Sequence, residues 1–364
     1  MRISVITVCL NSKKTIERTI QSVVNQKIKD LEYIIIDGGS NDGTQEIIKK
    51  YEDYISYWIS EPDNGLFFAM NKGIEKATGD IIAILNSDDY YESDTLAKVH
   101  NYFQKNIDIV CGDEYVISNE IKTVLRFKYG EEKEIHKRII YCHPAFFVKK
   151  SAYEKVGLFN TKYKYSSDYE WMIRAYDNNL KILKVNDIFT NCEDGGFGNS
   201  HLYEATIEQR NAALEHSLSV EMDEDIEKYY SIQLEYVKYI ENYNKLLKQK
   251  KINVVDIYRK LSDILEIDIN KKIYIWGVGR NGDRAFNFFE KIRINLEGFI
   301  DSNISIKKKR GLFVYSPNEI KNNSYIIITP FEYRSEIKKQ IDDLRLLDVK
   351  YFDLYMVVNC IMDS

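Results

Sequence analysis

Residues 31–44, LEYIIIDGGSNDGT, pass from an apolar strand pattern into a turn and then into a helix. Leu31–Ile36 is short and rich in β-branched residues, as expected of a strand buried on both faces. The turn at residues 37–43 combines glycines with Asp and Asn, which favour tight turns. Thr44–Tyr54 returns to helical spacing. A buried strand followed at once by a helix indicates a parallel sheet with helical crossovers.

The same alternation continues on both sides of this stretch. Ile3–Leu10 has the pattern of a buried strand, and Ser12–Gln26 has helical spacing with Ser12 as its expected N-cap. Strand and helix patterns follow at Tyr57–Ser60, Phe67–Lys76 and Asp80–Leu85. We therefore expect residues 1–110 to form an α/β layer structure that binds ligands at the carboxyl ends of its strands.

The composition is that of a soluble globular protein with several domains. The chain has 364 residues, of which 44% are hydrophobic and 29% charged, so it is not disordered. Its 51 basic and 56 acidic residues give a formal charge of −5, which leaves no footprint for nucleic acid. We predict a domain at 1–215, a helical connector at 216–270 and a second domain at 271–364.

Cysteine usage and hydropathy predict a cytoplasmic location. The five cysteines lie far apart and form no CxxC pair, as in proteins whose thiols stay reduced: Cys9, Cys111, Cys142, Cys192 and Cys360. No stretch approaches the roughly 20 apolar residues of a membrane span. Peripheral contact with a membrane and homo-oligomer formation stay open. The charged segment 204–251 is expected to be a solvated helix, with a partner-binding face as the alternative.

Three predicted strand ends carry polar or acidic residues and meet at one edge of the sheet. They are Asn11, Asp37 and the run Asn86–Asp89. Because the turn is supplied by 41–44, Asp37 is expected to stay free for a ligand. The adjacent carboxylates of Asp88 and Asp89 repel each other unless a cation or hydrogen-bond donors compensate. Oxygen ligands favour Mg²⁺ or Mn²⁺ over Zn²⁺; the alternative is an ordinary surface loop.

Several further segments, in this order, resemble the family-2 glycosyltransferases, which are bacterial enzymes of the GT-A fold. The resemblance covers about residues 1–215, and its combination of motifs is far more specific than any one of them. The segments are Val5–Val8 with Asn11, Ile36–Thr44, Ser60–Gly65, Ala69–Ile74, Gly79–Asp80 to Asp88–Asp89, His143–Phe147, Lys155–Phe159 and Ser167–Trp171.

The resemblance implies transfer from a nucleotide sugar, usually a UDP-sugar, with inversion at the anomeric carbon. It implies Asp168 as the general base, His143 as an acceptor contact and Asp89 as the direct ligand of Mn²⁺ or Mg²⁺. The purely structural alternatives are that Asp168 is the N-cap of its helix and that His143 is a buried core histidine. The implied donor-binding residues are Val8, Asp37, Asp63, Lys72, Asp88 and Asp89.

Some residues depart from the family pattern. Gly38 stands where many members have a second acidic residue, so recognition of the nucleotide base of the donor is expected to use other groups. Ser167 replaces an acidic residue before Asp168. The Gln-x-x-Arg-Trp pattern of processive synthases is absent, which indicates a single addition. The segment Glu193–His201 resembles the family's mobile loop that follows the general base. An ordinary loop at the end of a strand explains its glycines equally well.

The C-terminal region carries a dinucleotide-type fingerprint. Gly277, Gly279 and Gly282 follow the strand pattern Ile273–Trp276 and open a helix, and Asp301 follows 24 residues after Gly277. The region resembles the small Rossmann-like domains attached to sugar-modifying enzymes. A regulatory or vestigial domain is favoured, because no Tyr-x-x-x-Lys pattern accompanies the fingerprint. The run at 307–310 is expected to be a solvated loop.

The predicted fold class is therefore α/β: a GT-A domain with a mixed sheet, a helical connector and a small Rossmann-like domain. The predicted function is an inverting, metal-dependent glycosyltransferase acting on a glycan or lipid-linked oligosaccharide for the bacterial surface. One rival is an NAD-dependent oxidoreductase or epimerase centred on the C-terminal fingerprint. The other rival is a non-catalytic scaffold.

Overall fold

A computed structural model of the chain divides into two compact units, Met1–Ile232 and Gln233–Ser364. The boundary lies within one helix, and each unit is described by itself. The structure describes residues 1–364 except 104–105, 119–120, 126–133, 142, 194–200, 249–270, 292–293, 295, 302–305, 330–333, 345–348, 355–357 and 359–364. Cys142, Cys360, residues 194–200 of the expected mobile loop and residues 249–270 of the expected connector therefore lie outside the described residues.

The first unit is built on one mixed sheet with the strand order β3-β2-β1-β4-β8-β6-β9-β5, and β7 pairs with β6. The strands are β1 (Ile3–Cys9), β2 (Leu31–Asp37), β3 (Tyr57–Ser60), β4 (Ile81–Asn86), β5 (Tyr90–Tyr91), β6 (Ile109–Ser118), β7 (Ile121–Leu125), β8 (Phe146–Lys149) and β9 (Ile182–Glu193). The first four are mutually parallel, whereas β8 runs antiparallel to both β4 and β6.

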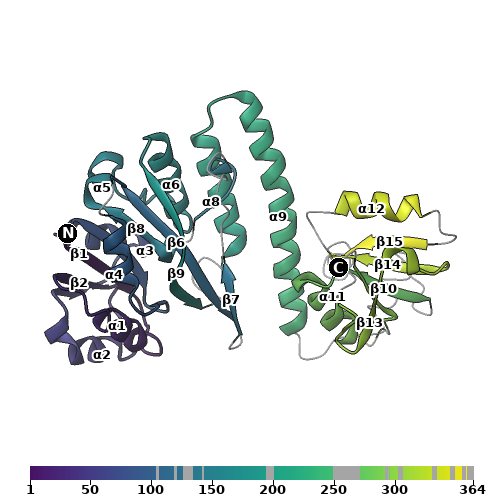
Figure 1. Cartoon of the computed structure of the whole chain (residues 1–364), viewed down its shortest axis with the longest axis horizontal. Helices are drawn as coiled ribbons and strands as arrows, with labels where there is room; N and C mark the ends of the chain where they lie inside the picture. Colours follow the sequence, from purple (N-terminus) through teal and green to yellow (C-terminus); the bar gives the residue numbers. More distant parts are fainter. Residues whose placement is uncertain are drawn as a thin grey trace. The chain divides into compact units, whose positions relative to one another are not determined.

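Helices cover both faces of this sheet (Figure 1). One face packs on α1 (Ile16–Val24), α2 (Thr44–Lys50) and α4 (Thr95–Tyr102). The other face packs on α3 (Leu66–Lys76), α5 (Lys150–Val156) and α6 (Ser167–Asp177). Alternate residues of β1 divide between the two layers, with Val5 in one and Ile6 in the other. This alternation explains why the buried strands are apolar along their whole length.

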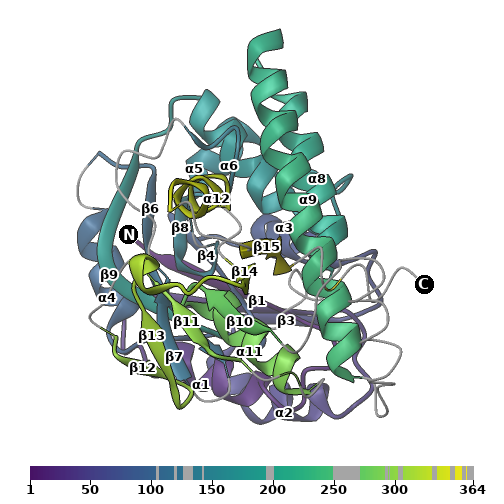
Figure 2. The same ribbon diagram turned by 90° about the vertical axis from the view of Figure 1, so that its right-hand side faces the viewer.

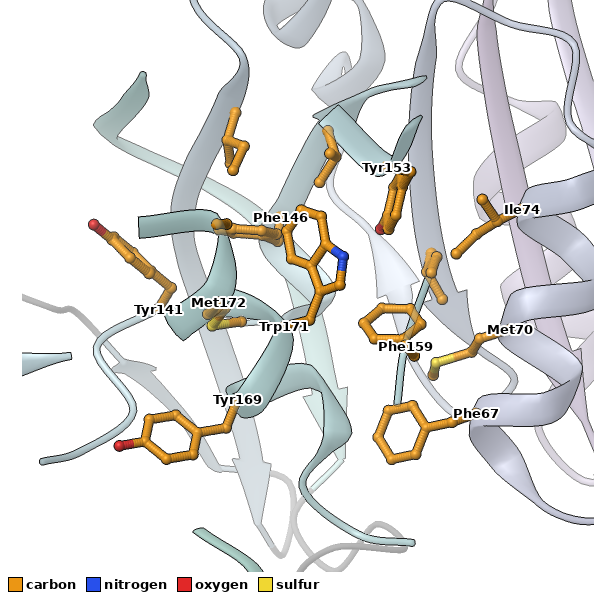
Figure 3. Packing of buried hydrophobic residues seen from close by; sticks show 14 of the residues in the cluster. Phe67, Met70, Ile74, Tyr141, Phe146, Tyr153, Phe159, Tyr169, Trp171 and Met172 are labelled. Carbon is orange, nitrogen blue, oxygen red and sulfur yellow. The ribbon is translucent and has the colours of Figure 1, made fainter. Parts of the chain in front are cut away.

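The second layer is organised around Trp171 (Figure 3). Its ring lies 4.7 Å from that of Tyr153 and 6.2 Å from that of Phe159, measured between centroids. Its indole nitrogen donates to the carbonyl oxygen of Gly157 at 2.8 Å. The side-chain amide of Asn71 on α3 donates to the carbonyl oxygen of Phe159 and accepts its N–H, each at 2.9 Å, which connects α3 to the same cluster. Several residues of the family-like motifs therefore hold the fold together here.

The charged segment expected to be one solvated helix, residues 204–251, forms two helices in the structure. They are α8 (Leu202–Glu215) and α9 (Val220–Lys248), and the boundary between the two units falls within α9. Ala212 and Ala213 of α8 are fully buried in the layer around Trp171. The expectation of a solvated helix is wrong for α8, because two pairs of small buried residues, Ala205–Thr206 and Ala212–Ala213, let it pack closely although its sequence is highly charged.

The second unit is a smaller sheet with the order β12-β13-β11-β10-β14-β15, parallel except for the β12–β13 pair. Figure 2 shows β13, β11 and β10 side by side. Its strands are β10 (Lys272–Trp276), β11 (Gly298–Ile300), β12 (Lys308–Lys309), β13 (Leu312–Tyr315), β14 (Ser324–Ile328) and β15 (Val349–Asp353). The helices α11 (Arg280–Lys291) and α12 (Arg334–Asp343) pack in separate clusters against alternate strand residues.

The basic run at 307–310 is exposed at Lys307, Lys308 and Arg310, as expected, but it includes a short strand. Lys308 and Lys309 form β12, and Lys309 Nζ donates to the carbonyl oxygen of Val278 and to Asp283. Arg310 also donates to Asp283, at 3.0 Å. Asp283, in the first turn of α11, therefore holds one end of this exposed run against the second unit. Among the helices that the structure describes, none combines the length and the hydrophobicity of a membrane span.

Candidate functional site

The parallel strands of the first unit end together at one edge of the sheet. Asp37 is paired with Cys9 on β1 and with Ser60 on β3, and Val8 is paired with Asn86 on β4. Val8 is buried, and the polar residues Asn86 and Asp37 pair with Val8 and with the residue that follows it. We call this carboxyl edge of β1–β4, with the turns that follow the strands, the polar rim.

The antiparallel strand β8 brings a second part of the chain to the polar rim. Because Ala83 of β4 pairs with Phe147, the start of β8 lies beside the end of β4. The short 3-10 turn His143–Ala145 precedes β8 directly and contacts β4. By the same antiparallel pairing, β6 and its parallel neighbour β9 reach the rim with their carboxyl ends. The rim therefore combines residues that are far apart in sequence.

Asp37 is fully buried and accepts four hydrogen bonds. The donors are the Ser40 backbone N–H at 3.0 Å, the hydroxyls of Ser40 and Ser60, and the Cys9 thiol at 3.4 Å. Both carboxylate oxygens are thus shared by protein donors, so Asp37 is not free as the sequence suggested. Burial and the Asp37 charge raise the pKa of the Cys9 thiol. Asp37 holds the turn after β2 in place.

Asp63 lies beside the glycine that departs from the family pattern. A Cβ added at Gly38 would lie 2.9 Å from Asp63 Oδ2 and 3.5 Å from a methyl group of Leu10. Asp63 Oδ1 accepts the Gly65 N–H at 2.9 Å. The absence of a side chain at position 38 therefore leaves room for the Asp63 carboxylate. Lys72, on α3, pairs with Glu61 at the neighbouring turn.

Asp88 and Asp89 follow β4 in a turn that is held by α1. Thr19 Oγ1 donates to the carbonyl oxygens of Ser87 at 2.9 Å and of Asp89 at 2.7 Å. Arg18 donates to the carbonyl oxygen of Asp88 at 2.8 Å and stacks 4.4 Å from the centre of the Tyr90 ring. The two carboxylates are therefore presented by a turn whose backbone is bonded on one side.

The electrostatics of this turn are dominated by buried negative charge. Burial raises the pKa of Asp89 well above its ordinary range, and the carboxylates of Asp88 and Glu114 add to the shift. Burial likewise raises the pKa of Asp88. The thiol of Cys192 donates to Glu114 at 3.2 Å, and burial raises its own pKa. A cation placed here would relieve repulsion among the carboxylates.

The sequence did not single out Glu114 and Cys192. They lie on β6 and β9, in the less regular half of the unit, and only the pairing of those strands brings them to Asp89. The register between β6 and β9 shifts on both sides of Asp113, where β9 contributes the extra residues, a bulge just before Glu114. A periodicity argument could not anticipate it, because a bulge changes the face to which the following side chains point.

The chemistry of these oxygens fits a divalent cation that shares its ligands with a substrate. Among the described residues, no group of three or more His, Cys, Asp and Glu side chains is arranged to hold a metal ion. Mg²⁺ commonly takes only one or two carboxylates and completes its shell with substrate phosphates and water. Asp89, with Asp88 beside it, fits that kind of site better than a closed cage.

Asp168 lies in the first turn of α6 and is not its N-cap, which is Ser166. Its Oδ1 accepts the backbone N–H of Tyr169 at 2.9 Å. Burial lowers the pKa of His143, and the nearby Asp168 carboxylate opposes that shift. The Asp168 carboxylate therefore acts electrostatically on His143, and the position of His143 before β8 relates both residues to the polar rim.

A buried ion pair anchors α6 behind Asp168. Arg174 donates two hydrogen bonds to Glu170, at 2.8 and 2.9 Å, and His216 Nε2 lies 3.3 Å from Glu170 Oε1. The hydrogen bond to Glu170 raises the pKa of His216. Burial would raise the pKa of Glu170, but the bonds from His216 and Arg174 lower it below its usual value.

The stability contributed by His216 is expected to depend on pH. Since its folded pKa is raised, its contribution is fully present below about pH 6.5, the ordinary histidine pKa, and is lost as the pH rises through the folded value. We expect His216→Ala to lower the free energy of unfolding more at about pH 5.5 than at about pH 9. Urea denaturation at both pH values measures this difference.

The matched control is His216→Gln, which keeps a hydrogen-bond donor toward Glu170 but cannot titrate. It should retain part of the stability and lose the pH dependence. A difference between wild type and His216→Ala that is the same at both pH values would contradict the assignment.

The C-terminal fingerprint has the geometry of a tight strand-to-helix turn. Gly277 has a φ of +110°, and a Cβ at Gly282 would lie 2.0 Å from the Gly277 carbonyl oxygen. The Val278 N–H donates to Asp301 Oδ2 at 3.2 Å. A Cβ added at Gly279 would meet open space as far as the described residues go. Gly277 and Gly282 are therefore required by the turn itself. The Asp301 carboxylate accepts a hydrogen bond from the backbone of the same loop and so stabilises it.

Two families match the sequence in separate regions. Residues 4–157 match Glycosyl transferase family 2, and residues 269–350 match C2185-like, N-terminal. An uncharacterized glycosyltransferase of Mycobacterium tuberculosis is 30% identical over 185 residues, which are 48% of this chain and 68% of the relative. A PGL/p-HBAD biosynthesis glycosyltransferase of the same species is 28% identical over 205 residues, 54% of this chain and 79% of the relative. Cholesterol galactosyltransferase of Borreliella burgdorferi is 30% identical over 239 residues, 60% of this chain and 63% of the relative.

Solved structures agree with these relatives on the fold. Residues 1–349 of S. aureus TarS, in complex with UDP-GlcNAc, superpose with a TM-score of 0.51 at 17% identity, covering 74% of this chain and 82% of that one. A longer TarS structure gives a TM-score of 0.50 at 19% identity, covering 64% of this chain and 43% of that one. The GT-A-like mixed sheet expected from the sequence is thereby confirmed, as is a second sheet at the C-terminus.

Proposed function

The chain belongs to glycosyl transferase family 2 and is a glycosyltransferase, and from this premise we propose its reaction. We propose that it transfers one sugar from a UDP-sugar, with inversion, to a hydroxyl group of a glycan or lipid-linked acceptor in bacterial surface polysaccharide synthesis. The observation that carries the proposal is the polar rim, where Asp63, Asp88 and Asp89 follow parallel strands and His143 with Asp168 joins them through β8.

The donor lies along the rim in this proposal. Asp63, which has room because position 38 is a glycine, faces the nucleoside. Lys72 leaves its ion pair with Glu61 and binds the phosphates of the donor instead. Asp37 acts through the turn after β2 that it holds, since its oxygens already accept bonds from Ser40, Ser60 and Cys9. The UDP-GlcNAc bound by TarS supports the choice of a UDP-sugar.

Asp89, assisted by Asp88, would hold Mn²⁺ or Mg²⁺ together with the donor diphosphate. Such a cation supplies Lewis-acid stabilisation of the charge that develops on the leaving diphosphate. Asp89 is suited to this role because its carboxylate is buried beside two other carboxylates, Asp88 and Glu114, where positive charge is strongly favoured.

Asp168 acts as the general base. Its carboxylate removes the proton of the acceptor hydroxyl while the acceptor oxygen bonds to the anomeric carbon, and the bond from that carbon to the diphosphate oxygen breaks with its electron pair. A single displacement of this kind inverts the anomeric configuration. His143, whose pKa is lowered by burial and raised in part by the Asp168 carboxylate, can orient the acceptor hydroxyl.

Relatives guide the choice of acceptor. The Borreliella relative is named for transfer of galactose to cholesterol, a lipid with one hydroxyl, and supports an acceptor that carries a lipid. Work on such an acceptor would take place at the inner face of the cell membrane, with the enzyme in the cytoplasm.

We propose that the second unit is Rossmann-like, because its strands follow the order expected of that fold around the turn at 277–282. We propose a regulatory role for it, because no Tyr-x-x-x-Lys pattern accompanies the fingerprint.

Thermal unfolding with UDP, GDP, CMP and NAD, each with and without Mn²⁺, tests the proposal. UDP with Mn²⁺ is expected to stabilise the protein, by about 2.7 kcal/mol at 100 times the dissociation constant. Removal of the metal with a chelator should abolish the effect. Stabilisation by NAD and none by UDP would move the chemistry to the fingerprint at Gly277–Asp301 and overturn the proposal. The anomeric configuration of the product, read by NMR, tests inversion.

A further inference from the structure

One carboxylate on α8 receives three successive backbone N–H groups. Glu208 accepts the N–H of Lys164 at 2.9 Å through Oε1, and those of Tyr165 and Ser166 at 2.7 and 3.0 Å through Oε2. Successive N–H groups that converge on an anion form a nest, and their bonds to a carboxylate are stronger than bonds between neutral groups. Residues 164–166 are therefore held by α8 through a single side chain.

The same segment starts the helix that carries the proposed base. Ser166 is the N-cap of α6 and is buried, and its hydroxyl donates to the carbonyl oxygen of Ala205 on α8 at 3.0 Å. Asp168 follows two residues later, in the first turn. Any shift of the nest would therefore rotate or translate the first turn of α6 together with the Asp168 carboxylate.

Of the remaining contacts of α6, the Ser167 hydroxyl donates to the carbonyl oxygen of Asn160 at 2.9 Å in the first turn, and the others hold the body of the helix. Trp171 and Arg174 bond to the backbone of residues 156–158, one and two turns farther along the helix. Packing of α8 on the unit depends on its buried alanines, not on Glu208. Loss of the Glu208 carboxylate would thus loosen the start of α6 and leave the helix and its core in place.

We propose that Glu208 is a positioning residue that sets the Asp168 carboxylate for proton removal. The inference rests on the proposed role of Asp168 and adds to it a residue from α8, beyond residues 4–157 that match the family. Since misplacement of a catalytic group by about 1 Å can slow a reaction about 100-fold, a carboxylate that fixes the helix start has a measurable kinetic effect.

The test compares Glu208→Gln with Glu204→Gln in the full chain. Glu204 is exposed on the same helix, one turn away, so its substitution changes the charge equally without touching the nest. For Glu208→Gln we expect kcat to fall at least about 10-fold. The KM for the UDP-sugar and the stabilisation by UDP with Mn²⁺ should not change. The acidic limb of the pH profile of kcat should shift, which a purely structural role would not produce. Glu204→Gln should match wild type in all of these.

Two outcomes overturn the inference. They are a wild-type kcat and pH profile in Glu208→Gln, and an equal change in Glu204→Gln. If Glu208→Gln fails to fold, Glu208→Asp replaces it, because it keeps the charge while withdrawing the carboxylate from the nest, with the same expectation. Full activity of Asp168→Asn would instead refute the proposed base. Failure of the inference is thereby distinguished from failure of the proposed function.

Discussion

Replacing Asp168 with Asn is expected to abolish sugar transfer while donor binding is retained. The amide keeps the size of the carboxylate and can still accept the bond from the Tyr169 N–H, so the first turn of α6 is preserved. It cannot accept a proton from the acceptor hydroxyl, and loss of a general base slows reactions by about 10²–10⁴-fold. Release of UDP from the UDP-sugar in the presence of acceptor measures the rate.

Donor binding provides the control for this variant. Stabilisation by UDP with Mn²⁺ should equal that of wild type, because Asp168 faces the acceptor in the proposal. Glu154→Gln, an exposed substitution on α5, should leave both the rate and the stabilisation unchanged. Transfer at the wild-type rate by Asp168→Asn would eliminate Asp168 as the base, and loss of UDP binding would reassign it to the donor side.

Replacing Asp89 with Ala is expected to remove both sugar transfer and the metal-dependent stabilisation by UDP. Asp89 is 5% exposed and lies among carboxylates, so it is the group on the rim best suited to a divalent cation. Without it, the diphosphate would leave with its charge uncompensated. We expect the stabilisation by UDP to become the same with and without Mn²⁺, as measured by thermal unfolding.

Neutralising Asp89 without changing its size should not destabilise the protein in the absence of metal. Burial raises the folded pKa of Asp89 above the unfolded value of about 3.9, so near neutral pH its charge opposes folding. Asp89→Asn, which keeps the size, should therefore unfold at the same temperature as wild type or higher. Asp94→Asn is the matched control: it is exposed, and Asn tolerates its positive φ of 59°. Retention of the Mn²⁺ effect in Asp89→Ala would move the metal to other ligands.

Much of the polar rim could be expected from the sequence. Asp88 and Asp89 follow an apolar run whose length and composition are those of a buried strand, and the carboxyl ends of parallel strands meet at one edge. Asp37 was also placed correctly at the end of β2, yet its state was not. Whether a carboxylate is free depends on donors such as Ser60 and Cys9, which neighbouring strands deliver.

Sequence alone located the strands β1–β4 and the helices α1–α3 between them, because burial on both faces and helical periodicity leave local patterns in the chain, whereas β5 and α4 were not predicted. It also determined the family and the motif residues at which chemistry is expected. Only the tertiary structure decided that Glu114 and Cys192 face Asp89, that Glu208 binds the backbone before α6, and that Lys309 reaches Asp283. These contacts join residues far apart in sequence through strand pairing and helix packing, and neither leaves a periodic signal at the residues that make the contact.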